Sequence, residues 1–206
     1  MSSSLVGSEM CIRDSLYPNQ TIQAKHDSFL QNMVFPVKHI MAHFYDDWGE
    51  IRGNGNRVHE GIDIRAPKGA PVVAIADGKI NTISYSDSSG YYIAIDHENG
   101  WLSLYVHLND DIKGNDNLGG KETAFAENIN LGVEVVAGQI IGYLGDSGNA
   151  EGTVPHVHFE VRYMGKSFDV YQHIKDSWFR FDQFIRFPKK IGCLLYTSDA
   201  ADDDVR

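Results

Sequence analysis

The chain has 206 residues, of which 42% are hydrophobic and 22% are charged, a composition typical of a globular protein with a sizeable core. Its formal net charge of -10 argues against a nucleic-acid binder, which would carry a basic patch. No run of 18 consecutive apolar residues occurs, so the sequence predicts no transmembrane helix.

The two ends of the chain differ from its middle in their pattern of apolar and polar residues. LVGSEMCIRDS (5–15) and CLLYTSDAADD (193–203) show no core pattern, and both resemble translated adapters from sequencing libraries. We therefore interpret 1–15 and 193–206 as non-native tails and expect the natural start to be missing, with natural disordered tails as the alternative. Both cysteines, Cys11 and Cys193, lie in these tails, so no disulfide or thiol chemistry is expected. The tails hold six acidic and two basic residues, which leaves a charge of -6 on the remainder.

The middle of the chain predicts short antiparallel strands. A lead-in segment of mixed pattern (16–48) is followed by a glycine-rich loop at 49–58. Apolar stretches then alternate with turn residues, and Asp-Gly and Asn-Gly turn signals lie within two of them. The stretches are GIDIRA (61–66), APVVAIADGKINTISYS (70–86), GYYIAIDHENGWLSLYVHL (90–108), GQIIGYLG (138–145) and VPHVHFEVRY (154–163). We expect a mainly β, sandwich-like antiparallel domain over 49–175, with short helices at its periphery.

Two further segments complete this prediction. Residues 109–130 are polar and glycine-rich and indicate a long loop, which in compact domains is usually functional or mobile. Residues 176–187 are rich in aromatic side chains and predict a short helix within a C-terminal closing segment, 176–192.

Two histidines, His156 and His158, stand two residues apart in the alternating stretch VPHVHFEV (154–161). Residues two apart on a strand face the same side, so both imidazoles are expected on one face. They could fill half-buried packing positions, or they could supply nitrogen ligands to a metal. The short motif alone does not decide between these interpretations.

A second stretch, HEGIDI (59–64), places His59 and Asp63 four residues apart with Gly61 between them. A tight turn could bring both side chains to one point. Two imidazoles and one carboxylate form the three-residue ligand set that leaves a catalytic zinc ion an open fourth position. A structural site would need a fourth ligand, usually cysteine, which the middle of the chain does not contain.

The remaining histidine of the pair would lie beside such a metal and could accept a proton from water. His107, in LYVHLND (104–110), ends a predicted strand and could line the same cleft. Two imidazoles beside a metal suit amide hydrolysis. Taken alone, His107 would be interpreted as a packed or surface histidine.

Three ordered motifs resemble the LytM/lysostaphin-type zinc metallopeptidases, which hydrolyse peptide bonds in bacterial peptidoglycan. The motifs are HEGIDIRAPKGAPVVAIADGKI (59–80), GYYIAIDHENGWLSLYVHL (90–108) and GQIIGYLGDSGNAEGTVPHVHFEV (138–161). The resemblance covers about 35–169 and implies a Zn²⁺ cofactor, a peptidoglycan peptide substrate and a place in the cell envelope, periplasmic or extracellular. The residues to which it assigns roles are the zinc ligands His59, Asp63 and His158, the general base His156 and the second catalytic imidazole His107.

The chain departs from the family pattern in three places. Segment 109–130 is longer than the usual link, and FDVYQHI (168–174) stands where many members have Asp-Pro. The tyrosine that lysostaphin-like relatives carry shortly before the first motif is absent from RGNGNRV (52–58). Its oxyanion role is therefore in doubt, and we state as a hypothesis from position alone that Arg52 or Arg57 substitutes for it.

Other polar residues receive no role. Glu60 is left out because on a strand it would point away from its neighbours. An acidic cluster beside the loop is expected to be solvated, and it consists of Asp46, Asp47 and Glu50. The histidines expected at the surface or in packing are His26, His39, His43, His97 and His173.

The leading interpretation is thus a zinc-dependent endopeptidase acting on the stem peptides or cross-bridges of peptidoglycan. The alternative is a non-catalytic LytM-like domain that binds or activates another cell-wall hydrolase. Relatives of that kind have typically lost ligands or catalytic histidines, whereas this chain keeps all five. A sugar-binding wall anchor has less support, because the residual charge is acidic and no aromatic stripe is visible. The bond that is cleaved and the oligomeric state do not follow from the sequence.

Overall fold

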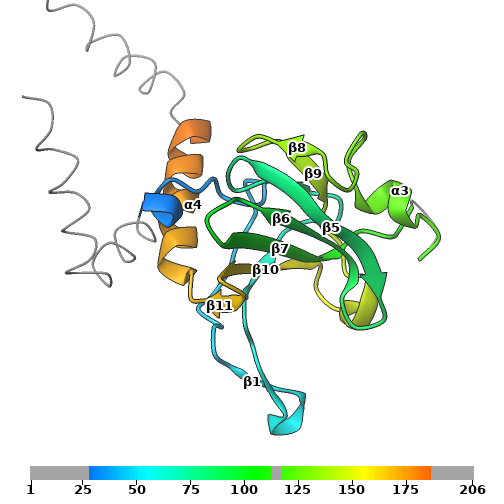
Figure 1. Ribbon diagram of the computed structural model, residues 1–206. Helices are drawn as coiled ribbons and strands as arrows, with labels where there is room; N and C mark the ends of the chain where they lie inside the picture. Colours follow the sequence, from blue (N-terminus) through cyan, green and yellow to red (C-terminus); the bar gives the residue numbers. More distant parts are fainter. Residues whose placement is uncertain (1–27, 113–116, 187–206) are drawn as a thin grey trace, which may run out of the picture.

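A computed structural model of the protein describes residues 28–112 and 117–186 and has a mainly antiparallel β architecture, as the sequence predicts (Figure 1). The expected non-native tails and both cysteines lie outside the described residues. Among the described helices, none has the length and apolar character needed to cross a membrane.

One sheet of seven strands forms the centre of the molecule. Its strands follow the order β11-β10-β7-β6-β5-β8, with β3 also pairing with β10, and all of these strand pairs are antiparallel. Hairpin turns join β5 to β6 and β6 to β7. The second is the turn that the Asn99-Gly100 signal predicts, and in it Glu98 and Asn99 are left-handed. The strands are β3 (Ile62–Arg65), β5 (Gly78–Ser86), β6 (Gly90–Asp96), β7 (Trp101–Leu108), β8 (Glu134–Val135), β10 (His156–Tyr163) and β11 (Lys166–Phe168).

A smaller sheet pairs β4 (Pro71–Val73) with β9 (Ile140–Tyr143). The Asp77-Gly78 dipeptide therefore does not join two strands of one hairpin, because β4 and β5 lie in different sheets. Instead, Asp77 accepts hydrogen bonds from other segments: its side chain binds the backbone N–H of Ala137 at 2.8 Å, and its carbonyl binds Nδ1 of His97 at 2.8 Å. These long-range contacts replace the local turn.

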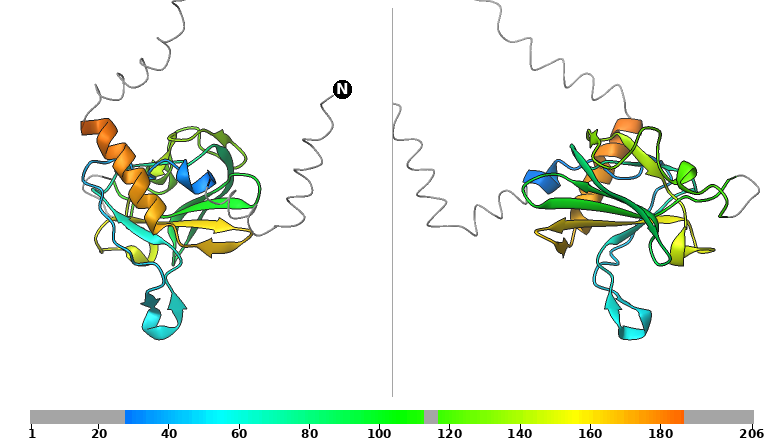
Figure 2. Two further views of the ribbon diagram at one scale, coloured as in Figure 1. Left: turned by 90° about the vertical axis from the view of Figure 1, so that its left-hand side faces the viewer. Right: turned by 45° about the vertical axis from the view of Figure 1, so that its right-hand side comes forward.

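The predicted loop at 49–58 forms a small hairpin. Strands β1 (Ile51–Arg52) and β2 (Arg57–Val58) pair around the short helix η1 (Gly53–Gly55). The hairpin projects away from the central sheet (Figure 2). Its position matters for the site, because His59 follows directly after β2.

Helices are few and peripheral, in agreement with the prediction. Segment 109–130 contains the single-turn helix α3 (Lys121–Ala124), and a second short helix, η2 (Gly148–Ala150), precedes β10. The closing helix α4 (Tyr171–Arg186) begins five residues earlier than the expected 176, where the side chain of Asp169 accepts the N–H of Tyr171 at 3.0 Å.

Helix α4 is held to the N-terminal part of the described chain. The rings of Trp178 and Phe35 lie 4.9 Å apart, and Arg180 donates a hydrogen bond to the carbonyl of Met33 at 2.8 Å. Ile174 on the helix is fully buried in the same core cluster as the strand residues Tyr105 and Phe159. Burial of these apolar side chains keeps the central strands in a rigid arrangement on which the site is built.

Candidate metal centre and active site

Strand pairing brings the predicted ligands together. In the antiparallel pair of β3 and β10, Asp63 lies directly opposite His158, and Arg65 lies opposite His156. His59 enters from the turn before β3, where Gly61 allows a close approach: a Cβ there would lie 2.7 Å from the His158 ring and 2.6 Å from the carbonyl oxygen of Phe159. The short glycine turn therefore places both side chains of HEGIDI beside the same histidine of β10.

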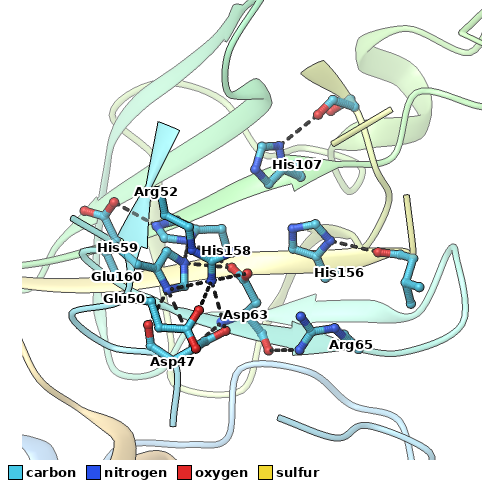
Figure 3. A network of polar contacts seen from close by, with 12 residues as sticks. Asp47, Glu50, Arg52, His59, Asp63, Arg65, His107, His156, His158 and Glu160 are labelled. Carbon is cyan, nitrogen blue, oxygen red and sulfur yellow. Dashed lines mark hydrogen bonds and ion pairs between the residues drawn. The ribbon is translucent and has the colours of Figure 1, made fainter. Parts of the chain in front are cut away.

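The three side chains meet at hydrogen-bond distance (Figure 3). Oδ1 of Asp63 lies 3.0 Å from Nε2 of His59 and 3.0 Å from Nδ1 of His158, and the two nitrogens are 2.8 Å apart. His59 and Asp63 are buried, and His158 is largely so. Two imidazole nitrogens and one carboxylate oxygen therefore converge at one point.

Outer hydrogen bonds determine which ring nitrogens face this point. Nδ1 of His59 donates to the backbone carbonyl of Asp47 at 2.8 Å, and Nε2 of His158 lies 2.9 Å from Oε1 of Glu160. Burial favours the neutral form of Glu160, but its hydrogen bond with His158 prevails and lowers the pKa of Glu160, so this carboxylate acts as the acceptor. When the two rings are neutral, the proton of each is thus directed outward, away from Asp63.

The donor set fits a divalent cation. Burial opposes charge on His158, yet the carboxylates of Asp63 and Glu160 raise the pKa of His158 to about 9. Burial likewise opposes charge on Asp63, but hydrogen bonds with His158 and His59 lower its pKa. The site therefore stabilises positive charge at the point where the three donor atoms meet, and a cation with nitrogen and oxygen ligands can replace the proton there.

Asp47 is part of this arrangement, and the expectation that it is solvated is wrong. It is 5% exposed, and its Oδ1 accepts the N–H of Asp63 at 3.3 Å. Burial raises the pKa of Asp47. Arg52 lies beside it, with Nη2 3.6 Å from Asp47 Oδ2 and 3.6 Å from Asp63 Oδ2, and 3.1 Å from Oε2 of Glu50. Arg52 is therefore already engaged by three carboxylates around the donor cluster.

The two other predicted histidines lie on the open side of the cluster. Nδ1 of His156 donates to the carbonyl of Val154 at 2.8 Å, and Nδ1 of His107 donates to the carbonyl of Ser147 at 2.8 Å. Their rings are 5.1 Å apart, and the rings of His107 and His158 are 6.4 Å apart. Burial lowers the pKa of His107 to about 4, so its ring is neutral at pH 7.

A β-bulge turns His107 toward the cluster. Along β7, Ser103 and Tyr105 point into the core, so regular alternation would also bury His107 there. The pairing register shifts between Tyr91 and Ile93 of β6, where β7 contains one extra residue, and His107 has a φ of 63°. The bulge returns the imidazole to the face of His156 and His158 and buries the next residue instead.

One cleft of about 920 Å³ is lined by all five residues for which the sequence predicts roles: His59, Asp63, His107, His156 and His158. The β1–β2 hairpin, β3, β7, β10 and the segment before β10 form its walls. The cleft is open to solvent and gives an extended chain access to the cluster.

Sequence reasoning missed two of the residues that position the cluster. Glu160 carried a signal, because it follows His158 by two positions and shares its strand face. Asp47 carried none, since it lies 12 residues before His59 and reaches it only through the fold. Glu60 lies outside the strands, and its side chain is 56% exposed with Oε2 3.9 Å from Arg162, so it remains outside the cluster.

A second group of acidic side chains lies apart from these histidines. Asp110, Asp111 and Asp146 have carboxylate oxygens within 4.8 Å of one another. The ammonium group of Lys68 sits among them, bound to Asp111 and 2.6 Å from Oδ1 of Asp146. Burial opposes charge on Lys68, but these ion pairs raise its pKa. Lys68 thus already supplies the positive charge that this group attracts.

Comparison with known proteins agrees with this geometry. The model of Peptidase family M23 matches residues 57–170. The chain is 33% identical over 145 residues to an "L-Ala--D-Glu endopeptidase" of Bacillus subtilis (strain 168), covering 66% of this chain and 40% of the relative. It is 33% identical over 104 residues to "Peptidoglycan DD-endopeptidase ShyC" of Vibrio cholerae, covering 50% of this chain and 20% of the relative. The chain thus spans less than half the length of both curated relatives.

Solved structures show the same fold. The catalytic domain of lysostaphin from Staphylococcus simulans matches with a TM-score of 0.51 and 25% identity, covering 72% of this chain and 96% of that one. A putative glycyl-glycine endopeptidase lytM from Ruminococcus gnavus matches with a TM-score of 0.60 and 24% identity, covering 85% of this chain and 74% of that one. The resemblance predicted from the three motifs is confirmed, and the chain belongs to peptidase family M23.

Proposed function

We propose that the protein is a zinc-dependent endopeptidase that hydrolyses peptide bonds in the stem peptides or cross-bridges of bacterial peptidoglycan. The observation that carries this proposal is the convergence of two imidazole nitrogens and one carboxylate oxygen in a cleft that two further imidazoles also line. The names of the relatives from Bacillus subtilis and Vibrio cholerae support the same substrate. Such a substrate implies a place in the cell envelope, periplasmic or extracellular.

In this proposal His59, Asp63 and His158 hold the zinc ion. When bound, zinc would act as a Lewis acid that polarises a peptide carbonyl and lowers the pKa of a coordinated water to about 7. Three protein ligands converge and no fourth joins them among the described residues, which is the pattern of a catalytic site with an open position. Asp47 and Glu160 orient the two ligand rings through the hydrogen bonds described above.

His156 would serve as the general base. Its Nδ1 proton is donated to the carbonyl of Val154, so Nε2 keeps a lone pair that can accept a proton from the attacking water. The same nitrogen can then give this proton to the leaving amine. His156 lies on β10 two residues from the ligand His158, which keeps the base on the same face as the ligands.

His107 would orient the attacking water. Its Nδ1 is used by the Ser147 carbonyl and its pKa is about 4, so Nε2 is an acceptor at neutral pH. An acceptor can hold a water O–H but cannot donate to a developing oxyanion. We therefore assign His107 the water-orienting role and not oxyanion stabilisation.

Digestion of purified sacculi tests this function. The full chain, loaded with zinc, is incubated with sacculi of known cross-link chemistry, and released fragments are identified by mass. We expect stoichiometric zinc in the protein and fragments cut at one type of peptide bond, and the masses identify that bond. Stoichiometric zinc without released fragments would favour a non-catalytic domain that acts on another hydrolase, and a failure to bind zinc would contradict the proposal.

A further inference from the structure

The cleft is lined by more basic than acidic side chains, although the protein as a whole is acidic. The chain has a formal net charge of -10, yet four arginines line the cleft. They come from the β1–β2 hairpin, β3 and β10, and they are Arg52, Arg57, Arg65 and Arg162. The acidic residues of the same lining are Glu60, Asp63 and Glu160.

Two of these arginines are neutralised by carboxylates of the protein. Arg52 makes the ion pairs with Asp47, Glu50 and Asp63 described above. Arg162 donates through Nε to Oε2 of Glu160 at 2.8 Å, and its Nη2 lies 2.6 Å from the same oxygen. These two guanidinium groups bind carboxylates in and around the donor cluster and help to hold them in place.

Arg65 has no such carboxylate partner in the part of the chain that the structure describes. It makes no ion pair with any residue in the ranges 28–112 and 117–186. Its Nη1 donates to the backbone carbonyl of Asp63 at 3.4 Å, and its guanidinium carbon lies 5.6 Å from the centre of the Tyr45 ring. These contacts hold the guanidinium group in place and leave most of its five N–H donors for a ligand.

Arg65 lies close to the proposed general base, His156. It lies directly across the strand pair from His156, and in Figure 3 its side chain lies near Asp63 and beneath His156. Two residues along β3 correspond to about 7 Å, so Arg65 lies one cross-strand pair beyond Asp63 on the His156 side. An extended substrate bound at the donor cluster would pass Arg65 within about two residues of the scissile bond.

Arg57 supplies a second guanidinium group to the cleft, from the β1–β2 hairpin. It is exposed on β2, its Cγ packs beside Gly53, and its side chain forms no ion pair with the part of the chain that the structure describes. The hairpin that carries it also forms a wall of the cleft. A ligand in the cleft would thus meet unpaired guanidinium groups from two separate elements.

We propose that Arg65 and Arg57 form a subsite for a carboxylate of the peptide substrate, close to the scissile bond. The planar fork of an arginine matches a carboxylate with two parallel hydrogen bonds, so this subsite would select an acidic peptide over a neutral one. Exposed charges are screened beyond about 8 Å at physiological salt. The two arginines can therefore attract a carboxylate within the cleft although the chain as a whole is acidic. The inference rests on the proposed function and defines its substrate as a peptide with a free carboxylate, in contrast to a neutral glycine bridge.

Matched peptides test the subsite. One synthetic stem peptide carries a free internal carboxylate and a free C-terminal carboxylate, a second has the internal group amidated, and a third has the C-terminus amidated. Hydrolysis is measured with the zinc-loaded wild-type chain, and binding is measured by calorimetry with zinc-loaded His156→Ala. The variants are Arg65→Gln, Arg57→Gln and, as a control that removes an exposed positive charge outside the cleft lining, Lys166→Gln.

We expect amidation of the internal group to lower kcat/KM and affinity by about tenfold or more, as loss of a hydrogen bond to a charged group does. Arg65→Gln should remove most of this difference between peptides, Arg57→Gln should reduce it, and Lys166→Gln should retain it. If amidation of the C-terminus, and not of the internal group, lowers kcat/KM and affinity, the carboxylate recognised is the chain end, and the enzyme would trim peptide termini.

The outcomes separate the subsite from the function. Equal handling of all three peptides by the wild-type chain, or an equal loss in Lys166→Gln, would overturn the subsite while hydrolysis upholds the function. A binding preference that depends on Arg65 without any hydrolysis would uphold the subsite and contradict the function.

Discussion

Glu160 accepts a hydrogen bond from Nε2 of His158 at 2.9 Å, two residues along the same strand. Because this proton points to Glu160, Nδ1 is the ring atom directed at Asp63 and His59. Arg162 in turn holds the second oxygen of Glu160. A carboxylate in this position fixes both the tautomer and the orientation of a ligand imidazole, so Glu160 is a positioning residue for the proposed zinc site.

Replacing Glu160 should weaken zinc binding more than it changes the fold. We expect Glu160→Ala to lower zinc affinity by about 10–100-fold, and Glu160→Gln to fall between Ala and the wild type because its amide oxygen still accepts a hydrogen bond. Competition with a chromophoric chelator measures the affinity. Glu60→Gln removes the same charge from an exposed neighbour and should bind zinc like the wild type. Unchanged affinity in Glu160→Ala would remove Glu160 from this role.

Zinc uptake should release a proton below pH 9. In the metal-free protein the neighbouring carboxylates raise the pKa of His158 to about 9, so the ring is charged at pH 7 and must lose a proton before it can coordinate. Apparent zinc affinity should therefore rise with pH by about tenfold per unit and level off above about pH 9. Calorimetry in two buffers of different ionisation enthalpy counts the protons. A binding enthalpy that is the same in both buffers at pH 7 would contradict the expectation.

Ligand and base variants should separate metal binding from turnover. His158→Ala and Asp63→Ala should lose zinc, because each removes one of three donor atoms. His156→Ala should keep zinc and lose hydrolysis by about 100-fold or more, because only the proton acceptor is removed. Metal content by atomic emission and sacculus digestion give the two readouts, and His173→Ala on α4 serves as the control. Full hydrolysis by His156→Ala would show that another group is the base.

The left-handed backbone of His107 predicts that two variants without activity differ in stability. Neither His107→Gly nor His107→Ala has the imidazole, so both should lose hydrolysis. Gly adopts a φ of 63° without steric cost, so His107→Gly should unfold about 1 kcal/mol less readily than His107→Ala. Chemical denaturation of the two variants measures the difference. Equal stabilities would mean that the β7 bulge relaxes when the histidine is removed.

Gly61 should not tolerate a methyl group. An added Cβ would lie 2.7 Å from the ring of His158 and 2.6 Å from the carbonyl oxygen of Phe159, closer than real Cβ atoms approach. We expect Gly61→Ala to displace the β3–β10 contact and to lower zinc affinity by about tenfold or more, as a shift of a positioned ligand does. Zinc titration measures the effect, and far-UV circular dichroism checks that the sheet persists. Wild-type affinity would show that the turn can move without shifting His158.

Much of the site was predictable because its signals are local. The two-residue period of a strand puts His156 and His158 on one face, and the short spacing around Gly61 allows His59 and Asp63 to meet. The same period also placed Glu160 on that face, although its role was not recognised. The mainly antiparallel β class followed from the repeated strand and turn pattern and is confirmed.

Other features depend on contacts between segments distant in sequence. The hairpin at 51–58 pairs strands of only two residues each, too short for a clear pattern. Asp77 does not form the hairpin turn that the sequence predicts, and it accepts hydrogen bonds from Ala137 and His97 instead. Helix α4 begins at Tyr171 because Asp169 accepts the N–H of that residue, which extended the helix beyond its aromatic-rich part.

The amino-acid sequence by itself determined the chemical types at the site and their order along the strands, because alternation and turn spacing act over a few residues. Only the tertiary structure decided that Asp47 is buried against His59, that a bulge carries His107 to the side of His156, and that Arg65 lies in the cleft with no carboxylate partner in the described part of the chain. These properties arise from burial and from pairing between remote strands, and the free energy of such contacts is not encoded in any single stretch of the chain.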